Sequence, residues 1–177
     1  MSTVSQIKDQ LRAYAAVAPP SKGMFFKTGP SDYGAHDRFL NISVPFLRKM
    51  AKQYANLTLP EIQEFLNSSF NEERFLALIF LVDRYNRGTP DIQEEVYFFY
   101  KKNLHQVNNW NLVDASAHLI MGAYLETRDR SSLLDLSASS VMWERRIAMV
   151  STWAFIRQGD LEWTFFLARN LLKDSHD

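Results

Sequence analysis

Two short segments of this 177-residue chain carry side chains suited to chemistry on a charged ligand. In the first, Trp110 and Asp114 are four residues apart, and in the second, Trp143 and Arg146 are three residues apart. Both spacings place the two side chains on one face of an α-helix. A carboxylate, a guanidinium and two indoles on neighbouring helices would suit a cationic or phosphorylated ligand.

The carboxylate and the guanidinium each allow a functional and a purely structural interpretation. The apolar residues Leu112 and Val113 before Asp114 favour a half-buried carboxylate that stabilises a developing cation or positions a water molecule. The alternative is an aspartate that caps a helix or forms an ion pair. Arg145 and Arg146 point about 100° apart on a helix, so one can clamp a phosphate while the other faces solvent. The alternative is a pair of surface arginines.

Other catalytic and metal-binding signatures are absent from the sequence. Without cysteine there is no thiol nucleophile, thiolate metal site or disulfide. The sequence also lacks a phosphate-binding glycine loop and a nucleophile elbow. Metal-ligand spacing is missing among the histidines, so we expect neither a metal nor a cofactor. These histidines are His36, His105, His118 and His176.

Charge is balanced over the whole chain but not along it. The net charge is zero, which weighs against a nucleic-acid-binding protein. Residues 1–57, however, contain eight Lys or Arg against three Asp, an excess of five positive charges. This asymmetry can form a basic face on a neutral protein, although solvated helix surfaces would explain it equally well.

Hydrophobic periodicity predicts helices along nearly the whole chain, joined by short loops. A Pro follows Ser43 at one expected helix start, and Thr58 with Glu61 forms a capping box at the next. A Gly-Pro and Ser/Asp-rich loop is expected at residues 28–34. The main expected helices are residues 4–18, 22–27 (short), 72–86, 90–102, 110–126, 131–138, 143–158 and 161–172.

This pattern predicts an all-α fold in a single domain, residues 1–177. Successive antiparallel helix pairs of about forty residues favour a HEAT- or armadillo-like α-solenoid. A plain helical bundle is the alternative, because the pairs do not repeat in sequence. We expect no membrane span, since no apolar run approaches 18 residues, and no signal peptide at the N-terminus. A cytoplasmic location fits these features and the absence of cysteine.

The order of several motifs resembles that of the DNA alkylation repair glycosylases of the AlkD type, which are HEAT-like repeat proteins. The matching stretches span most of the chain, and the Trp-x-x-x-Asp and Trp-x-x-Arg elements stand at about the family's separation. Two departures are Asn41, where many relatives have Gly, and Asn111, where many have Asp. The stretches are residues 25–30, 33–34, 37–49, 110–114 and 143–148.

The resemblance implies a monomer that hydrolyses the N-glycosidic bond of cationic alkylpurines in duplex DNA, such as N3-alkyladenine and N7-alkylguanine. It places the catalytic carboxylate at Asp114, the active-site indole at Trp110 and the catalytic-site guanidinium at Arg146. It also implies further helices after residue 177, so we expect this chain to lack them. Expected additional DNA contacts are Lys27, Arg38, Trp143 and Arg145.

Two other functions stay open at the level of sequence. One is a HEAT-like module that binds DNA without catalysis, and the other is a protein-binding solenoid. Asp114 separates the first from a glycosylase, because a carboxylate in a groove that only binds backbone would repel phosphate. Arg146 and the basic N-terminal third weigh against the second.

Overall fold

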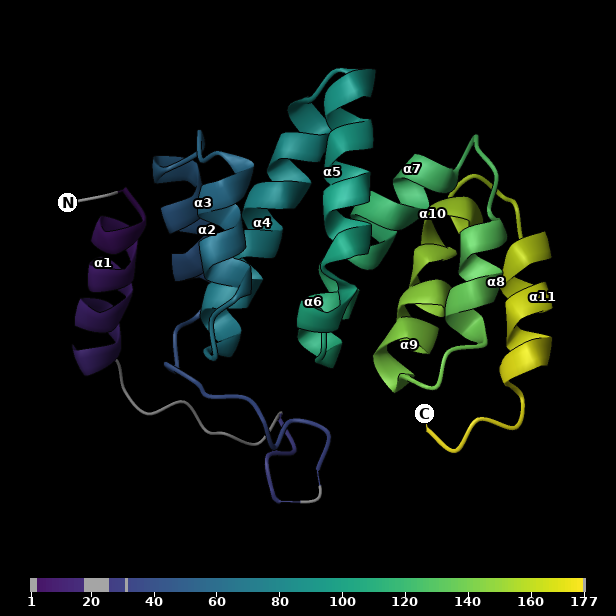
Figure 1. Ribbon diagram of the computed structural model, residues 1–177, viewed down its shortest axis with the longest axis horizontal. Helices are drawn as coiled ribbons and strands as arrows, with labels where there is room; N and C mark the ends of the chain where they lie inside the picture. Colours follow the sequence, from purple (N-terminus) through teal and green to yellow (C-terminus); the bar gives the residue numbers. More distant parts are fainter. Residues whose placement is uncertain (1–2, 18–25, 31, 177) are drawn as a thin grey trace. The chain divides into compact units, whose positions relative to one another are not determined.

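The computed structural model describes residues 3–17, 26–30 and 32–176. The chain divides into two compact units, residues 1–83 and residues 84–177. Regular secondary structure in the described residues is helical, without any β-strand (Figure 1). None of the described helices is both long and apolar enough to cross a membrane. The predicted all-α fold is therefore confirmed, and the stacking of helix pairs as a solenoid stays a prediction.

The first unit contains the helices α1, α2 and α3 and most of α4, which continues to Arg87. Ser43 occupies the N-cap position of α2 without a side-chain capping hydrogen bond. The capping box expected for Thr58 and Glu61 is confirmed at the start of α3. The bounds are Thr3–Val17 for α1, Val44–Gln53 for α2, Leu59–Leu66 for α3 and Asn71–Arg87 for α4. Buried side chains include Ile7, Leu11, Leu47, Ile62, Phe65 and Leu76.

Between α1 and α2 the structure describes turns and extended chain. The expected loop at residues 28–34 is confirmed for its described residues. Most of the short helix expected at residues 22–27 lies outside the described residues, and Phe26 and Lys27 are not helical. Asn41 has a positive φ of 58°. Glycine suits this left-handed conformation and asparagine tolerates it, which explains why this departure from the family pattern is compatible with the fold.

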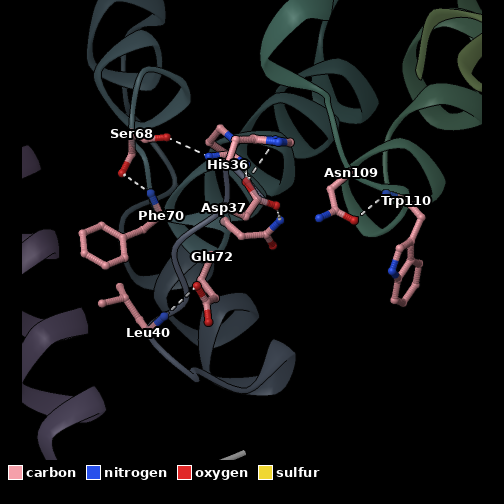
Figure 2. A network of polar contacts seen from close by, with 10 residues as sticks. His36, Asp37, Leu40, Ser68, Phe70, Glu72, Asn109 and Trp110 are labelled. Atoms are coloured by element: carbon pink, nitrogen blue, oxygen red, sulfur yellow. Dashed lines mark hydrogen bonds and ion pairs between the residues drawn. The ribbon is translucent and has the colours of Figure 1, made fainter. Parts of the chain in front are cut away.

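A buried ion pair holds the end of this loop against the start of α4. The Asp37 carboxylate is fully buried and pairs with the guanidinium of Arg74, which is 3% exposed. Asn71 Nδ2 donates to the same carboxylate at 2.9 Å. The Glu72 carboxylate accepts the main-chain N–H of Leu40 at 2.9 Å (Figure 2). Side chains from the first turn of α4 therefore satisfy polar groups of the loop.

The second unit contains a series of short helices built around an apolar core. Figure 1 shows α8, α9 and α11 running side by side at the C-terminal end of this unit. Core side chains include Tyr100, Leu112, Ile120, Ile147 and Phe155. The bounds are Pro90–Lys102 for α5, Leu104–Gln106 for the 3₁₀-helix η1, Trp110–Asp114 for α6, His118–Gly122 for the π-helix η2, Ala123–Leu125 for α7, Ser131–Ser137 for α8, Met142–Ser151 for α9, Trp153–Ile156 for α10 and Glu162–Leu171 for α11.

The prediction of one helix over residues 110–126 is wrong, because the segment breaks after Asp114. At the break, the Ser116 hydroxyl donates to the Leu112 carbonyl at 2.6 Å and lies 2.9 Å from the Tyr100 hydroxyl. Hydroxyl bonding to a carbonyl four residues back competes with the helical ladder. The chain continues as a π-helix, and Gly122 at its end lies so close to α9 that a Cβ would stand 2.2 Å from the Ser151 carbonyl oxygen.

The prediction of one helix over residues 143–158 is also wrong in detail. The segment forms α9 and α10 with an interruption at Thr152. Two successive hydroxyls bond back to the main chain there: Ser151 to the Ile147 carbonyl at 2.7 Å and Thr152 to the Met149 carbonyl at 2.8 Å. Both interruptions in the second unit therefore occur where a Ser or Thr hydroxyl bonds to the preceding helical turn.

Candidate active site

Asp114 and Arg146 form a two-point ion pair between α6 and α9. Arg146 Nε donates to Asp114 Oδ1 at 3.1 Å, and Nη2 donates to Oδ2 at 2.9 Å. This parallel geometry is the strongest arrangement of a guanidinium and a carboxylate, and it fixes the orientation of both groups. The Asp114 side chain is 39% exposed and that of Arg146 is 34% exposed. Both charged groups therefore remain open to a ligand from solvent.

A short helix positions the carboxylate. The buried Asn109 is the N-cap of α6, and its Oδ1 accepts the N–H of Trp110 at 2.8 Å (Figure 2). Leu112 and Val113 are fully buried, so the remaining face of this single turn presents Trp110 and Asp114. The flanking apolar residues noted in the sequence thus anchor α6, whereas the carboxylate lies at the edge of the core.

Both indoles of the predicted site lie in the first turn of their helices. Trp110 is the first residue of α6, and Trp143 is the second residue of α9. Each is partly buried, with part of its surface open to solvent. An indole in this state is available as one wall of a ligand site and also packs against its own unit.

Arg145 is engaged elsewhere. Its Nε and Nη2 donate to the two carboxylate oxygens of Asp174, and Nη1 donates to the Ser139 carbonyl at 3.0 Å. The side-chain hydrogen bonds from Arg145, together with the N–H of His176, lower the pKa of Asp174 to about 2. All three nitrogens of this guanidinium have partners, so the predicted DNA contact of Arg145 competes with an internal ion pair.

Lys27 and Arg38, the other two predicted DNA contacts, belong to the first unit. Both are exposed. The Arg38 guanidinium carbon lies 4.6 Å from the centroid of the Phe70 ring, a cation–π contact that orients the side chain. Arg12 lies over the same ring at 4.7 Å. Arg38 is therefore held in place while keeping an exposed charge.

Comparison with known protein families assigns the chain to a group of DNA repair proteins. A family model described as DNA alkylation repair enzyme matches residues 7–177. The chain belongs to this family. No curated protein and no solved structure matches the chain significantly. The predicted membership is thereby confirmed, and it covers both compact units.

In this member of the DNA alkylation repair family, the sequence analysis did not identify two aromatic residues of the second unit, His118 and Trp153. His118 follows Asp114 by four residues and stacks on Trp153, with ring centroids 4.6 Å apart and an interplanar angle of 31°. Desolvation, followed by the charge of Arg157, lowers the pKa of His118, while the carboxylate and main chain of Asp114 oppose this shift. The available signal was the four-residue spacing of Asp114 and His118 within the single helix that the sequence predicted there.

The described part of the chain contains no group of three or more His, Cys, Asp or Glu side chains placed to bind a metal ion. The arrangement of Asp114 and Arg146 supports electrostatic stabilisation of a charged ligand. A fixed, solvent-accessible carboxylate stabilises a positive charge that develops beside it, and it can orient a water molecule for attack on that centre.

Proposed function

We propose that this chain is a DNA glycosylase that hydrolyses the N-glycosidic bond of cationic alkylated purines in duplex DNA, among them N3-alkyladenine and N7-alkylguanine. The observation that carries the proposal is the exposed two-point pair of Asp114 and Arg146 in a member of the DNA alkylation repair family. A groove that only bound DNA backbone would have no use for this carboxylate, because it repels phosphate.

The substrate's chemistry suits a site whose main charged group is a carboxylate. An alkylated purine already carries a positive charge, so it leaves as a neutral base without protonation. As the N-glycosidic bond breaks, positive charge develops on the deoxyribose. The Asp114 carboxylate stabilises that charge and orients the water molecule, which adds to C1′ and transfers its proton to solvent or to the carboxylate.

Arg146 and Trp110 hold the reacting nucleotide in this proposal. Two nitrogens of Arg146 orient the Asp114 carboxylate, whereas Nη1 makes no hydrogen bond among the described residues. This nitrogen is able to donate to a phosphate of the bound strand, which fixes the backbone next to the reacting sugar. Trp110 on the same face as Asp114 attracts the cationic base through its π-face.

The remaining predicted contacts are assigned to the DNA backbone. Lys27 and Arg38 supply exposed positive charges from the first unit, and Trp143 lies three residues from Arg146 on α9. Arg145 contributes less than Arg146, since Asp174 already occupies its guanidinium. The protein is proposed to act as a monomer on alkylated double-stranded DNA.

Release of 7-methylguanine from methylated duplex DNA tests the proposal. Asp114→Asn keeps the size and the hydrogen-bonding shape of the side chain but removes its charge. We expect release to fall by about 100-fold or more, in line with the loss of one electrostatic stabiliser in a transition state. The exposed Asp135 on α8 offers a matched control, since Asp135→Asn should release the base at the wild-type rate. Undiminished release by Asp114→Asn would refute the glycosylase assignment.

A further inference from the structure

Trp153 has an exposed indole ring, and the proposed roles of Trp110, Asp114 and Arg146 do not account for this exposure. It is 52% exposed at the start of α10, and large aromatic side chains in this state often mark an interaction surface. One side of the ring contacts His118 in a tilted arrangement, with ring centroids 4.6 Å apart. The second unit therefore supports one side of the indole and leaves about half of its surface open.

Arg157 lies on the same helical face as Trp153 and adds an unneutralised charge. It follows Trp153 by four residues, and its N–H donates to the Trp153 carbonyl at 3.2 Å. The Arg157 side chain is exposed and forms no ion pair among the described residues. Its charge contributes to the lowered pKa of His118, which keeps the imidazole neutral near pH 7. The neighbouring ring thus adds no second charge that would repel Arg157.

This pair lies near the proposed catalytic group, because His118 interacts electrostatically with both Asp114 and Arg157. Along the chain, Trp153 and Arg157 are seven and eleven residues beyond Arg146. Arg146 lies on α9, whereas Arg157 directly follows α10, beyond the interruption at Thr152. The two arginines would therefore meet different phosphates.

We propose that Trp153 and Arg157 form a second subsite that binds the DNA backbone at a phosphate other than the one bound by Arg146. This inference rests on the proposed function. Arg157 binds a phosphate, and Trp153 contacts the adjoining sugar with its ring and a phosphate oxygen with its indole N–H. His118 acts as a positioning residue, since it contacts the indole and not the DNA. The subsite would lengthen the footprint without contributing to bond cleavage.

Binding of unmodified duplex DNA over a range of salt concentrations tests the subsite. We expect Arg157→Ala to reduce the slope of log K against log salt by about 0.9, the value for one lost phosphate contact. Trp153→Ala should weaken binding by about tenfold, with a smaller effect on the slope. The exposed Arg169 and Phe165 on α11 supply matched controls, and Arg169→Ala and Phe165→Ala should bind like the wild type.

The outcomes separate this subsite from the glycosylase assignment. Wild-type affinity and slope in both variants would overturn the subsite, even if base release depends on Asp114. Absence of any duplex binding by the wild-type protein would overturn it as well. Weaker binding by both variants together with no base release by the wild type would support the subsite and contradict the glycosylase. Circular dichroism of Trp153→Ala and Arg157→Ala checks that both variants fold.

Discussion

The two units each contain an Asp–Arg ion pair, and the pairs differ in their exposure. In the first unit, Asp37 and Arg74 are 0% and 3% exposed, and the carboxylate also binds Asn71. In the second unit, Asp114 and Arg146 are 39% and 34% exposed. The same pair of functional groups is thus enclosed in one unit and open to solvent in the other.

This difference in exposure fits our proposal that the first pair stabilises the fold and the second pair takes part in function. A buried pair is hard to replace, because removing one partner leaves an uncompensated charge in the interior. An exposed pair contributes little to stability and can exchange its partner for a ligand. Arg145 and Asp174 stand between these cases at 15% and 14% exposure. Exposure, rather than the presence of an ion pair, therefore indicates which arginine can exchange its partner for a ligand.

The largest expected effect is on stability, from breaking the buried pair. Asp37→Ala leaves the Arg74 guanidinium buried without its carboxylate, so we expect a loss of about 3–5 kcal/mol in the free energy of unfolding. Chemical denaturation followed by circular dichroism measures this loss. Glu95→Ala, which breaks an exposed pair with Arg84, is the control and should cost less than about 1 kcal/mol. Equal stabilities for the two variants would remove the distinction between buried and exposed pairs.

The next effect separates the neighbouring arginines by their DNA binding. We expect Arg146→Ala to weaken duplex binding and to lower the slope of log K against log salt by about 0.9. Arg145→Ala should change the slope less, because Asp174 and the Ser139 carbonyl already occupy its donors. Titration of both variants at several salt concentrations provides the comparison. A larger change in the slope for Arg145→Ala would reverse the assignment of the two side chains.

The smallest effect concerns pH and the pair that links α9 to the end of the chain. Folding lowers the pKa of Asp174 from 3.8 to about 2 through the hydrogen bonds of Arg145. A carboxyl group with a lowered pKa stabilises the folded state above its unfolded pKa, and this contribution disappears as the pH falls toward 2. We expect the NMR signal of the Asp174 carboxyl carbon to titrate near pH 2. In Arg145→Ala its midpoint should return toward 3.8, and an unchanged midpoint would exclude Arg145 as the cause.

Much of the fold was predictable because helix starts and apolar periodicity are local signals. The capping box of Thr58 and Glu61 and the start of α6 at Trp110 follow the sequence closely. The two helix breaks were not predicted, since Ser116 and Thr152 lie inside otherwise regular apolar patterns. Their effect depends on whether the hydroxyl bonds to the preceding turn or to a partner elsewhere. The Tyr100 hydroxyl, which meets Ser116, is such a partner.

Only part of the candidate site was predictable from the sequence. Spacing identified Asp114 and Arg146 as neighbours of Trp110 and Trp143 on two helices, and the structure joins the two charged groups. Spacing could not distinguish Arg146 from Arg145, because the choice depends on where Asp174 lies after folding. The stacking of His118 on Trp153 was missed for the same reason, since the two rings are 35 residues apart in the sequence.

The most direct test measures catalysis and stability on the same two variants, Asp114→Asn and Asp135→Asn. Single-turnover release of 7-methylguanine from methylated duplex DNA gives the catalytic rate, and chemical denaturation gives the free energy of unfolding. We expect Asp114→Asn to release the base at least about 100-fold more slowly than the wild type, while its free energy of unfolding stays within about 1 kcal/mol of the wild-type value. Release at the wild-type rate by Asp114→Asn would contradict the proposed catalytic role of this carboxylate.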